Sequence, residues 1–453
     1  RAECELLGGN FEQAKQGIVE LLQRAASKVD QAAVYHLKVQ LHSLMGEHPP
    51  AVDSALTCLH SFGIDLPAHP TFEQVQAEYD MIWQTLDGRS VASLIELPVM
   101  TDPELRAAMQ MLSVMNLPAY QTDQNLLDLH LCRMVNLTLQ HGICGASAHG
   151  FGAFFAVLLR PVFRRYTDGY RFAKLACDLV DKHGFISYRA KVYHALAYVA
   201  HWTQPLATVI DLVRASTRAA IETGDLTFAC FGMFQTVTDL LLRNDPLDVV
   251  WRESEVALEY ARAAKYGDAV DTVRSQQRFI ANMQGRTASF SSFSDAQLDE
   301  ATFEAQLTGN GRTLVICWYW ILKLKARFLS GDYADALAAA DKVKPLLSAG
   351  HFQVQLIDYF FYTALTVAAL YESASDRDQT GWRDLLTAHQ EQLREWADTY
   401  PPTFADKHAL VSGEIANIEG RELDAMRLYE EAIRAARENG FVHNEGVANE
   451  VAA

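Results

Sequence analysis

Apolar side chains recur along most of this chain at spacings of three and four residues. The stretch that follows Gly420 is an example: its apolar positions form one stripe along a helix and consist of Ala425, Leu428, Tyr429, Ala432, Ile433 and Ala436. Few stretches alternate between apolar and polar residues, which is the pattern of a half-buried strand. The pattern therefore predicts an all-α protein with no sheet.

Short segments rich in proline, glycine and asparagine interrupt this periodicity. Proline removes a backbone N–H and disfavours helical conformation in the residue before it, so a helix seldom continues through such a segment. Examples are residues 46–50, 67–70, 244–246 and 400–402. Breaks at these intervals predict roughly twenty helices joined by tight turns.

One six-residue phrase occurs four times, with a glycine at its start and an alanine at its end. The glycine can take the left-handed conformation that ends one helix, and the alanine stands where the next helix presses closely on the first. The four copies are residues 9–14, 224–229, 331–336 and 420–425. They predict the turns of helical hairpins.

The best-formed copy is similar to a tetratricopeptide repeat. Ala425, Tyr429 and Ala432 have the spacing of its second helix, where small residues admit a neighbouring helix and an aromatic ring fills the gap between hairpins. The other copies are degenerate. The sequence thus predicts an α-α superhelix of degenerate tetratricopeptide-like hairpins, an architecture that commonly presents a binding surface.

We expect a single continuous array over residues 1–453, with candidate sub-blocks at 1–122, 123–284 and 298–453. The array is interrupted near 285–313 by polar, Gly- and Ser-rich sequence, which predicts an ordered insertion loop with a short helix between two polar stretches. Such an insertion can serve as a lid or hinge, but an ordinary surface insertion is favoured.

Charge and cysteine content limit the kinds of partner and the cellular compartment that we expect for this chain. The 39 basic and 56 acidic residues give a net charge of -17, which disfavours nucleic acid and anionic membranes as partners. The seven cysteines are scattered without a C-x-x-C pair, as expected of reduced core residues in a cytoplasmic protein. The first residues contain neither an initiator Met nor an apolar targeting segment, so we expect a fragment of a longer protein, and no apolar run approaches the length of a membrane span.

Signatures of catalysis are missing from the sequence. There is no G-x-x-x-x-G-K-[ST], H-E-x-x-H, G-x-S-x-G or kinase catalytic-loop pattern, which predicts that this segment is not an enzyme and carries no cofactor. The Gly- and Ser-rich stretch 142–152 superficially resembles a phosphate-binding helix start. It lacks a lysine and a preceding strand, so a tight helix crossing is favoured.

Several polar and aromatic side chains could line a partner or ligand groove, although each also has a structural explanation. The arginines could receive a carboxylate-rich or phosphorylated partner, or be paired internally. The histidines are seven residues apart, too far for a common metal ion, which favours packing or groove lining. The tryptophans could form a platform or wedge between hairpins. These candidates are Arg164, Arg165, Arg171, His194, His201, Trp202, Trp318 and Trp320.

Longer phrases resemble the helical-repeat middle region of large multi-domain signalling kinases. The phrases lie at residues 169–173, 189–193, 201–202, 222–225, 395–397, 436–441 and 448–450. In the family that the chain resembles, a Ser/Thr-kinase-like domain and a signal-transduction-type ATPase module precede the repeats, and a GAF domain and a histidine kinase follow. None of that family's catalytic residues has a matching position here, so the resemblance transfers no site.

The resulting hypothesis is a non-catalytic sensing, coupling and protein-interaction segment of a signal-transduction kinase. Its partners would be protein segments or flanking domains of the same polypeptide, with a small-molecule inducer as a further occupant of the groove. Two alternatives stay open. One is a free-standing interaction scaffold, and the other is a helical enzyme whose site has no known signature.

Overall fold

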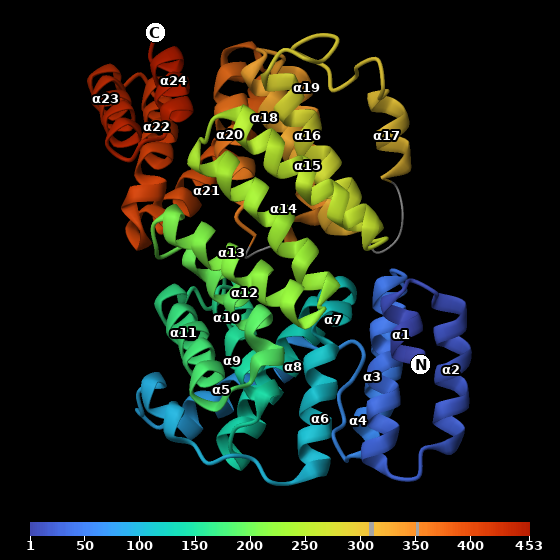
Figure 1. Ribbon diagram of the computed structural model, residues 1–453. Helices are drawn as coiled ribbons and strands as arrows, with labels where there is room; N and C mark the ends of the chain where they lie inside the picture. The colour runs from blue at the N-terminus through green and yellow to red at the C-terminus, as the bar shows by residue number, and fades with distance from the viewer. Residues whose placement is uncertain (308–311, 350–352) are drawn as a thin grey trace. The chain divides into compact units, whose positions relative to one another are not determined.

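The computed structural model of this chain describes residues 1–307, 312–349 and 353–453. Within these residues every regular element is a helix, and the only β-type pairing is an isolated bridge between Val99 and Ile143 (Figure 1). The predicted all-α class is therefore confirmed. None of the described helices is long and apolar enough to cross a membrane.

The described chain divides into two compact units. Unit 1 comprises residues 1–199, 215–230 and 262–266, and unit 2 comprises residues 200–214, 231–261 and 267–453. Four helices contribute residues to both units: α12 (Arg189–Ala200), α13 (Leu206–Thr223), α14 (Leu226–Arg243) and α15 (Leu247–Ala263).

The remaining helices of unit 1 are α1 (Ala2–Leu7), α2 (Phe11–Arg24), α3 (Lys28–Leu44), α4 (His48–Ser61), α5 (Phe72–Leu86), η1 (Val91–Glu96), α6 (Pro103–Val114), α7 (Asn116–Thr122), α8 (Gln124–His141), α9 (Gly145–Ala153), α10 (Phe155–Leu158), α11 (Tyr166–His183) and η2 (Ile186–Tyr188). Those of unit 2 are α16 (Gly267–Met283), α17 (Glu300–Gln306), α18 (Thr313–Leu329), α19 (Tyr333–Val343), η3 (Lys344–Ala349), α20 (Leu356–Leu370), η4 (Tyr371–Ser373), α21 (Asp376–Thr399), α22 (Pro401–Ile418), α23 (Glu422–Glu438) and α24 (Val442–Val451).

The predicted hairpin turns are present at all four copies of the phrase. Their glycines have φ angles of 71° to 79°, the left-handed region that a Cβ atom disfavours. At the third copy, the Gly331 N–H donates to the Phe328 carbonyl oxygen (3.0 Å) and the Asp332 N–H donates to the Arg327 carbonyl oxygen (2.9 Å). These two bonds form a Schellman C-cap and satisfy carbonyls at the end of α18.

The alanines that end the phrase lie in the hairpin interiors, as predicted. Ala14, Ala229 and Ala336 have no exposed surface, and Ala425 is 3% exposed. A larger side chain at these positions would hold the two helices of a hairpin apart, which explains why the phrase ends in alanine.

In unit 2 the helices pack as a series of hairpins. The helices α18 and α19, α20 and α21, and α22 and α23 are paired, and α20 also packs against α18 on one side and α22 on the other. Helix α16 packs against α18. Alternate helices of the series, α16, α18, α20 and α22, therefore form a continuous row, and the candidate site described below lies along it.

The stretch 142–152 forms a tight helix crossing in unit 1, as the sequence favoured. A Cβ atom at Gly150 would lie 3.0 Å from the Cβ of Met134 on α8, and one at Gly152 would lie 3.4 Å from the Cβ of Ala176 on α11. Glycine at both positions permits α9 to lie this close to the two helices.

Between α16 and α18 the chain leaves the hairpin series, in the region of the expected insertion. The Glu300 carboxylate, at the start of α17, accepts a hydrogen bond from the Phe293 N–H (3.0 Å) and pairs with Arg327 of α18 (2.6 Å). The Phe293 ring is fully buried. The insertion is thus packed onto the hairpins, although residues 308–311 of its second polar stretch lie outside the described residues.

Gly142, in the turn between α8 and α9, lies where a larger residue would collide with the backbone. Gly142 has φ 92°, and a Cβ atom there would lie 2.2 Å from the Pro98 carbonyl oxygen. We expect Gly142→Ala to lower the free energy of unfolding by at least about 3 kcal/mol, because neither backbone segment can yield without losing the bridge at Ile143. Urea unfolding monitored by circular dichroism measures the change.

Gly381 provides the matched control, because it is exposed on α21 and a Cβ atom there would meet nothing within 4 Å. Gly381→Ala should raise the free energy of unfolding by about 0.5–1 kcal/mol through helix propensity. Equal effects of the two substitutions would contradict this interpretation of Gly142.

Candidate functional site

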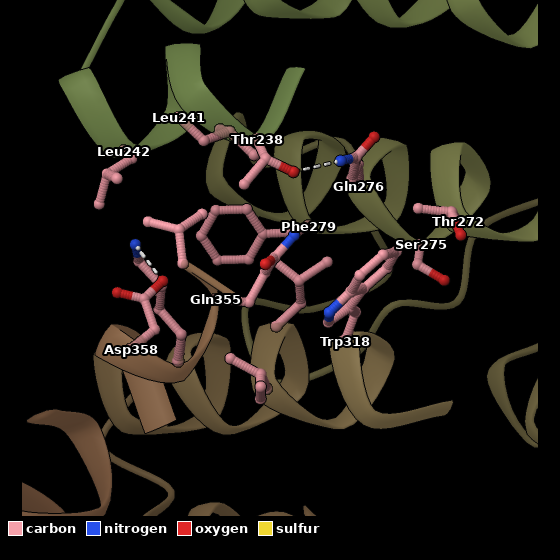
Figure 2. Close-up of a pocket in the computed structure, with 14 residues that line it drawn as sticks. Thr238, Leu241, Leu242, Thr272, Ser275, Gln276, Phe279, Trp318, Gln355 and Asp358 are labelled. Carbon is pink, nitrogen blue, oxygen red and sulfur yellow. Dashed lines mark hydrogen bonds and ion pairs between the residues drawn. The ribbon is translucent and has the colours of Figure 1, made fainter. Parts of the chain in front are cut away.

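A pocket in unit 2 is the candidate site (Figure 2). Its walls come from α14, α16, α18 and the start of α20, and its lining consists of Thr238, Leu241, Leu242, Thr272, Ser275, Gln276, Phe279, Trp318, Ile321, Leu322, Lys325, Val354, Gln355 and Asp358. The cavity measures about 50 Å³. Since a buried water needs roughly 10–15 Å³, this space holds about four waters or a small group of similar size.

Helical periodicity on α16 and α18 produces two of the walls. On α18 the lining positions 318, 321, 322 and 325 follow the spacing of three, one and three that defines one face of a helix. On α16 the positions 272, 275, 276 and 279 repeat the same spacing. The α16 face carries Thr, Ser and Gln where a core helix usually carries aliphatic residues, so the pocket is polar on one side.

Gln276 is the most completely buried amide in this lining, with 4% of its surface exposed. Its Nε2 donates to the Phe234 carbonyl oxygen (2.9 Å) and to Thr238 Oγ1 (2.9 Å), as Figure 2 shows for the second bond. Because a carbonyl oxygen can only accept, these contacts fix which end of the amide is nitrogen. The buried Oε1 finds no hydrogen-bond donor among the described residues.

An ion pair lies at the other side of the pocket. Lys325 Nζ lies 3.0 Å from Asp358 Oδ2, and Lys325 is only 5% exposed. The ammonium also stands over the ring of Phe279, 5.6 Å from its centroid. A buried charge is costly unless it is paired, so each partner depends on the other.

Gln355 adds a second amide to the lining, directly before α20 and three residues before Asp358. Its Oε1 is buried and, within the described part of the chain, has no donor. The lining therefore combines the amide of Gln355, whose oxygen has no donor within the described residues, with one ion pair and apolar walls that include Trp318 and Ile321. Such a surface can bind a small molecule that brings hydrogen-bond donors and an apolar body.

The arginines proposed from sequence lie in unit 1, at the start of α11. Asp168 Oδ2 accepts a hydrogen bond from Arg165 Nε (2.8 Å), and Asp168 Oδ1 accepts one from Arg171 (3.2 Å). Arg165 also stacks over the Trp83 ring at 3.6 Å, and Arg164 donates to the Pro161 carbonyl oxygen (2.7 Å). All three are held by neighbours in the same unit, and their role toward a partner stays a prediction.

The two histidines proposed from sequence are buried and fall in different units. His194 packs edge-on against Phe228, with ring centroids 5.3 Å apart. His201 Nε2 lies 2.7 Å from Asp239 Oδ1 at a fully enclosed site in unit 2. No group of His, Cys, Asp and Glu side chains within the described residues is arranged to hold a metal ion.

The tryptophans proposed from sequence occupy three environments in unit 2. Trp202 is buried and stacks on Phe404, with centroids 5.7 Å apart and planes 8° apart. Trp320 is half-buried beneath Lys323, whose ammonium lies 4.9 Å from the ring centroid. Trp318 alone among the eight candidates lines the pocket. Whether the others take part in a binding groove stays a prediction.

The pocket residues Gln276, Lys325, Gln355 and Asp358 did not emerge from the sequence. A signal was present for two of them, because Lys325 and Gln276 occupy positions that helical periodicity assigns to an apolar stripe. A polar residue at such a position has to find a partner in the interior. Only the fold identifies that partner, since Asp358 lies 33 residues away from Lys325 in the sequence.

Comparison with known proteins agrees with this architecture. Residues 304–449 match the family described as "CHK1-like, TPR repeats". The match begins near the end of α17, covers α18 to α23 completely and includes most of α24. The pocket residues of α18 and α20 therefore fall within it, and those of α14 and α16 precede it.

A longer stretch of the chain is similar to a signalling protein. It is 22% identical over 306 residues to "Hybrid signal transduction histidine kinase G" of Dictyostelium discoideum, which is 63% of this chain and 9% of that protein. The chain thus spans a small fraction of this relative. The two comparisons support a tetratricopeptide-like repeat region with a distant likeness to part of a histidine kinase.

Outside the pocket, buried histidines carry large pKa shifts. Burial lowers the pKa of His130 on α8 to about 4, against a partial opposing effect of its contacts with the Leu126 and Leu127 backbone. Burial likewise lowers the pKa of His389 on α21 to about 4, opposed by its 2.9 Å contact with the Phe360 carbonyl oxygen. Both rings are packed as neutral core groups.

These shifts predict acid sensitivity. Between pH 6.5 and 4 the unfolded chain binds a proton at each histidine while the folded chain does not, so the free energy of unfolding falls as the pH falls. The loss approaches about 3 kcal/mol per histidine below pH 4. Urea unfolding between pH 7 and 4 should show a smaller decrease for His389→Leu than for the natural protein, and an identical decrease in both would contradict the assignment.

The buried ion pair of the pocket gives a second prediction. Lys325→Met leaves Asp358 without its cation and should lower the free energy of unfolding by about 3 kcal/mol. Arg252→Met is the control, because Arg252 and Asp248 form a pair at 3.2 Å whose side chains are 69% and 71% exposed. That change should cost less than about 1 kcal/mol. Comparable losses in the two variants would show that the pocket pair is not buried in solution.

Proposed function

We propose that this chain is a non-catalytic interaction and coupling segment of a multi-domain signal-transduction kinase. One observation carries the proposal: the chain is similar over 306 residues to part of a histidine kinase, and its described residues form helical hairpins. Helical-repeat arrays of this kind usually present surfaces for other proteins. The segment would work in the cytoplasm, where its seven free thiols would stay reduced.

The partner would be a protein segment or flanking domain of the same polypeptide. Exposed apolar side chains on α23 support a protein contact in unit 2, since Leu423 is 83% exposed and Met426 is 61% exposed three residues further on. Residues at this spacing share a helix face. The net charge of -17 favours a basic or neutral partner and disfavours nucleic acid and anionic membranes.

Coupling requires that the segment bind two states of its polypeptide differently. A surface with equal affinity for both states shifts no equilibrium, however tightly it binds. The proposed role is therefore to favour one arrangement of the attached ATPase and kinase domains, and a small-molecule inducer would act by changing that preference. A free-standing scaffold would bind its partner without any such effect.

The exposed α23 face provides the test. Leu423→Glu combined with Met426→Glu should weaken binding of the partner segment at least tenfold, because each change places a charge in an apolar contact. Calorimetry of this chain with the separate partner segment measures the binding, and incorporation of phosphate from ATP by the complete polypeptide measures kinase output. Both quantities should change together.

Val256→Glu is the matched control, since Val256 is 59% exposed on α15 of the same unit. It should leave binding and phosphorylation as they are. Loss of binding with unchanged phosphorylation would favour the free-standing scaffold. No effect of the α23 substitutions on either quantity would refute the proposed contact.

A further inference from the structure

We propose that the unit 2 pocket binds a small zwitterion with an aliphatic side chain, of the kind represented by a branched-chain α-amino acid. The proposal deepens the proposed function, because it names the chemical class of the inducer. Its role as an inducer rests on that function, whereas binding itself can be measured without it.

The charges of the pocket argue for a ligand that carries both signs. Lys325 and Asp358 form a neutral pair joined through Nζ and Oδ2 at 3.0 Å. An ammonium has three N–H groups and a carboxylate has two oxygens, so the pair leaves donors on one partner and an acceptor on the other. A ligand with a single charge would leave an excess charge in a largely buried site, whereas a zwitterion would not.

The amide oxygen of Gln355 favours a ligand that donates hydrogen bonds. Gln355 Oε1 is buried and has no donor within the described residues. An orphaned acceptor costs about 1–3 kcal/mol, which a bound water or a ligand N–H can recover. The ligand ammonium would accordingly contact Asp358 and Gln355, and the ligand carboxylate would contact Lys325.

Exposure indicates how such a molecule would be oriented. Gln355 and Asp358 are half-buried, so the charged end of the ligand would face the more open part of the pocket. Trp318, Ile321 and Phe279 are 7%, 1% and 4% exposed and form the deeper apolar wall. The cavity of about 50 Å³ has room for about four non-hydrogen atoms, so it would enclose only the side chain of leucine, and the ammonium and carboxylate would lie at the opening of the pocket.

Calorimetry of the whole chain with L-leucine and L-valine tests the proposal. We expect saturable binding with a Kd below about 1 mM for one of them. The decarboxylated analogue 3-methylbutylamine and the deaminated analogue 4-methylpentanoate each lack one charge and should bind at least tenfold more weakly than leucine. Absence of saturable binding by either amino acid would overturn the proposal and leave a pocket for water only.

Variants locate the binding within the pocket. Asp358→Asn retains the shape of the side chain and should weaken leucine binding at least tenfold through loss of its charge. Leu322→Phe enlarges a half-buried lining residue and should block the apolar space, which keeps the test decisive if Asp358→Asn is unstable. Asp248→Asn, on exposed α15 surface, is the control and should bind as the natural chain does.

Three results would refute the assignment: equal affinity for leucine and its singly charged analogues, unchanged binding by Leu322→Phe, or loss of binding in the Asp248→Asn control. If leucine binds but does not change kinase output, the binding site is supported and the role of the ligand as an inducer is refuted. If the α23 substitutions change kinase output but leucine does not bind, the proposed function is supported and the proposed leucine site is refuted.

Discussion

Neighbouring helices of this protein have to approach each other closely to form a core. A helix buries an apolar stripe only if another helix lies against it, and the distance between them is set by the side chains at the contact. Buried alanines such as Ala336 set that distance within hairpins, and Gly150 and Gly152 set it at the crossing of α9 with α8 and α11. Glycines in the left-handed conformation then form turns tight enough for the second helix to pack against the first.

The same packing explains why polar groups gather in one place in unit 2. Alternate helices form a row from α16 to α22, and their facing sides have to be filled by side chains. At the pocket, Ser275 and Gln276 of α16 and Trp318 and Lys325 of α18 line the same cavity. Polar groups there are satisfied only in part, which contributes less to stability than an apolar core and leaves an opportunity for a ligand.

The proposed functions use two different surfaces of unit 2. The α23 face offers exposed apolar side chains for a protein partner, and the pocket offers enclosed polar groups for a small molecule. The pocket is bounded by four helices, so a ligand that fills it contacts α14, α16, α18 and α20 at once. Binding of this kind can favour one arrangement of those helices, which is the physical requirement for coupling.

The local features of this protein could be predicted from its sequence. Periodicity predicted helices, Gly331 and Gly420 predicted left-handed turns, and Ala425 predicted a buried contact; each depends on residues within a few positions of one another. The sequence did not predict the pocket, although the polar residues Lys325 and Gln276 occupy positions of an apolar helix stripe and so indicate buried polar contacts. The partner of Lys325 is Asp358, which the fold brings to 3.0 Å from it.

Tertiary structure also decided how the candidate residues were distributed. Arg165 and His194 belong to unit 1, whereas Trp202 and Trp318 belong to unit 2, and only Trp318 lines the pocket. Neighbouring sequence positions cannot specify this, because the environment of a side chain is made by helices that are distant in sequence. Local sequence therefore fixed the helices and their turns, and long-range packing decided which side chains became a site.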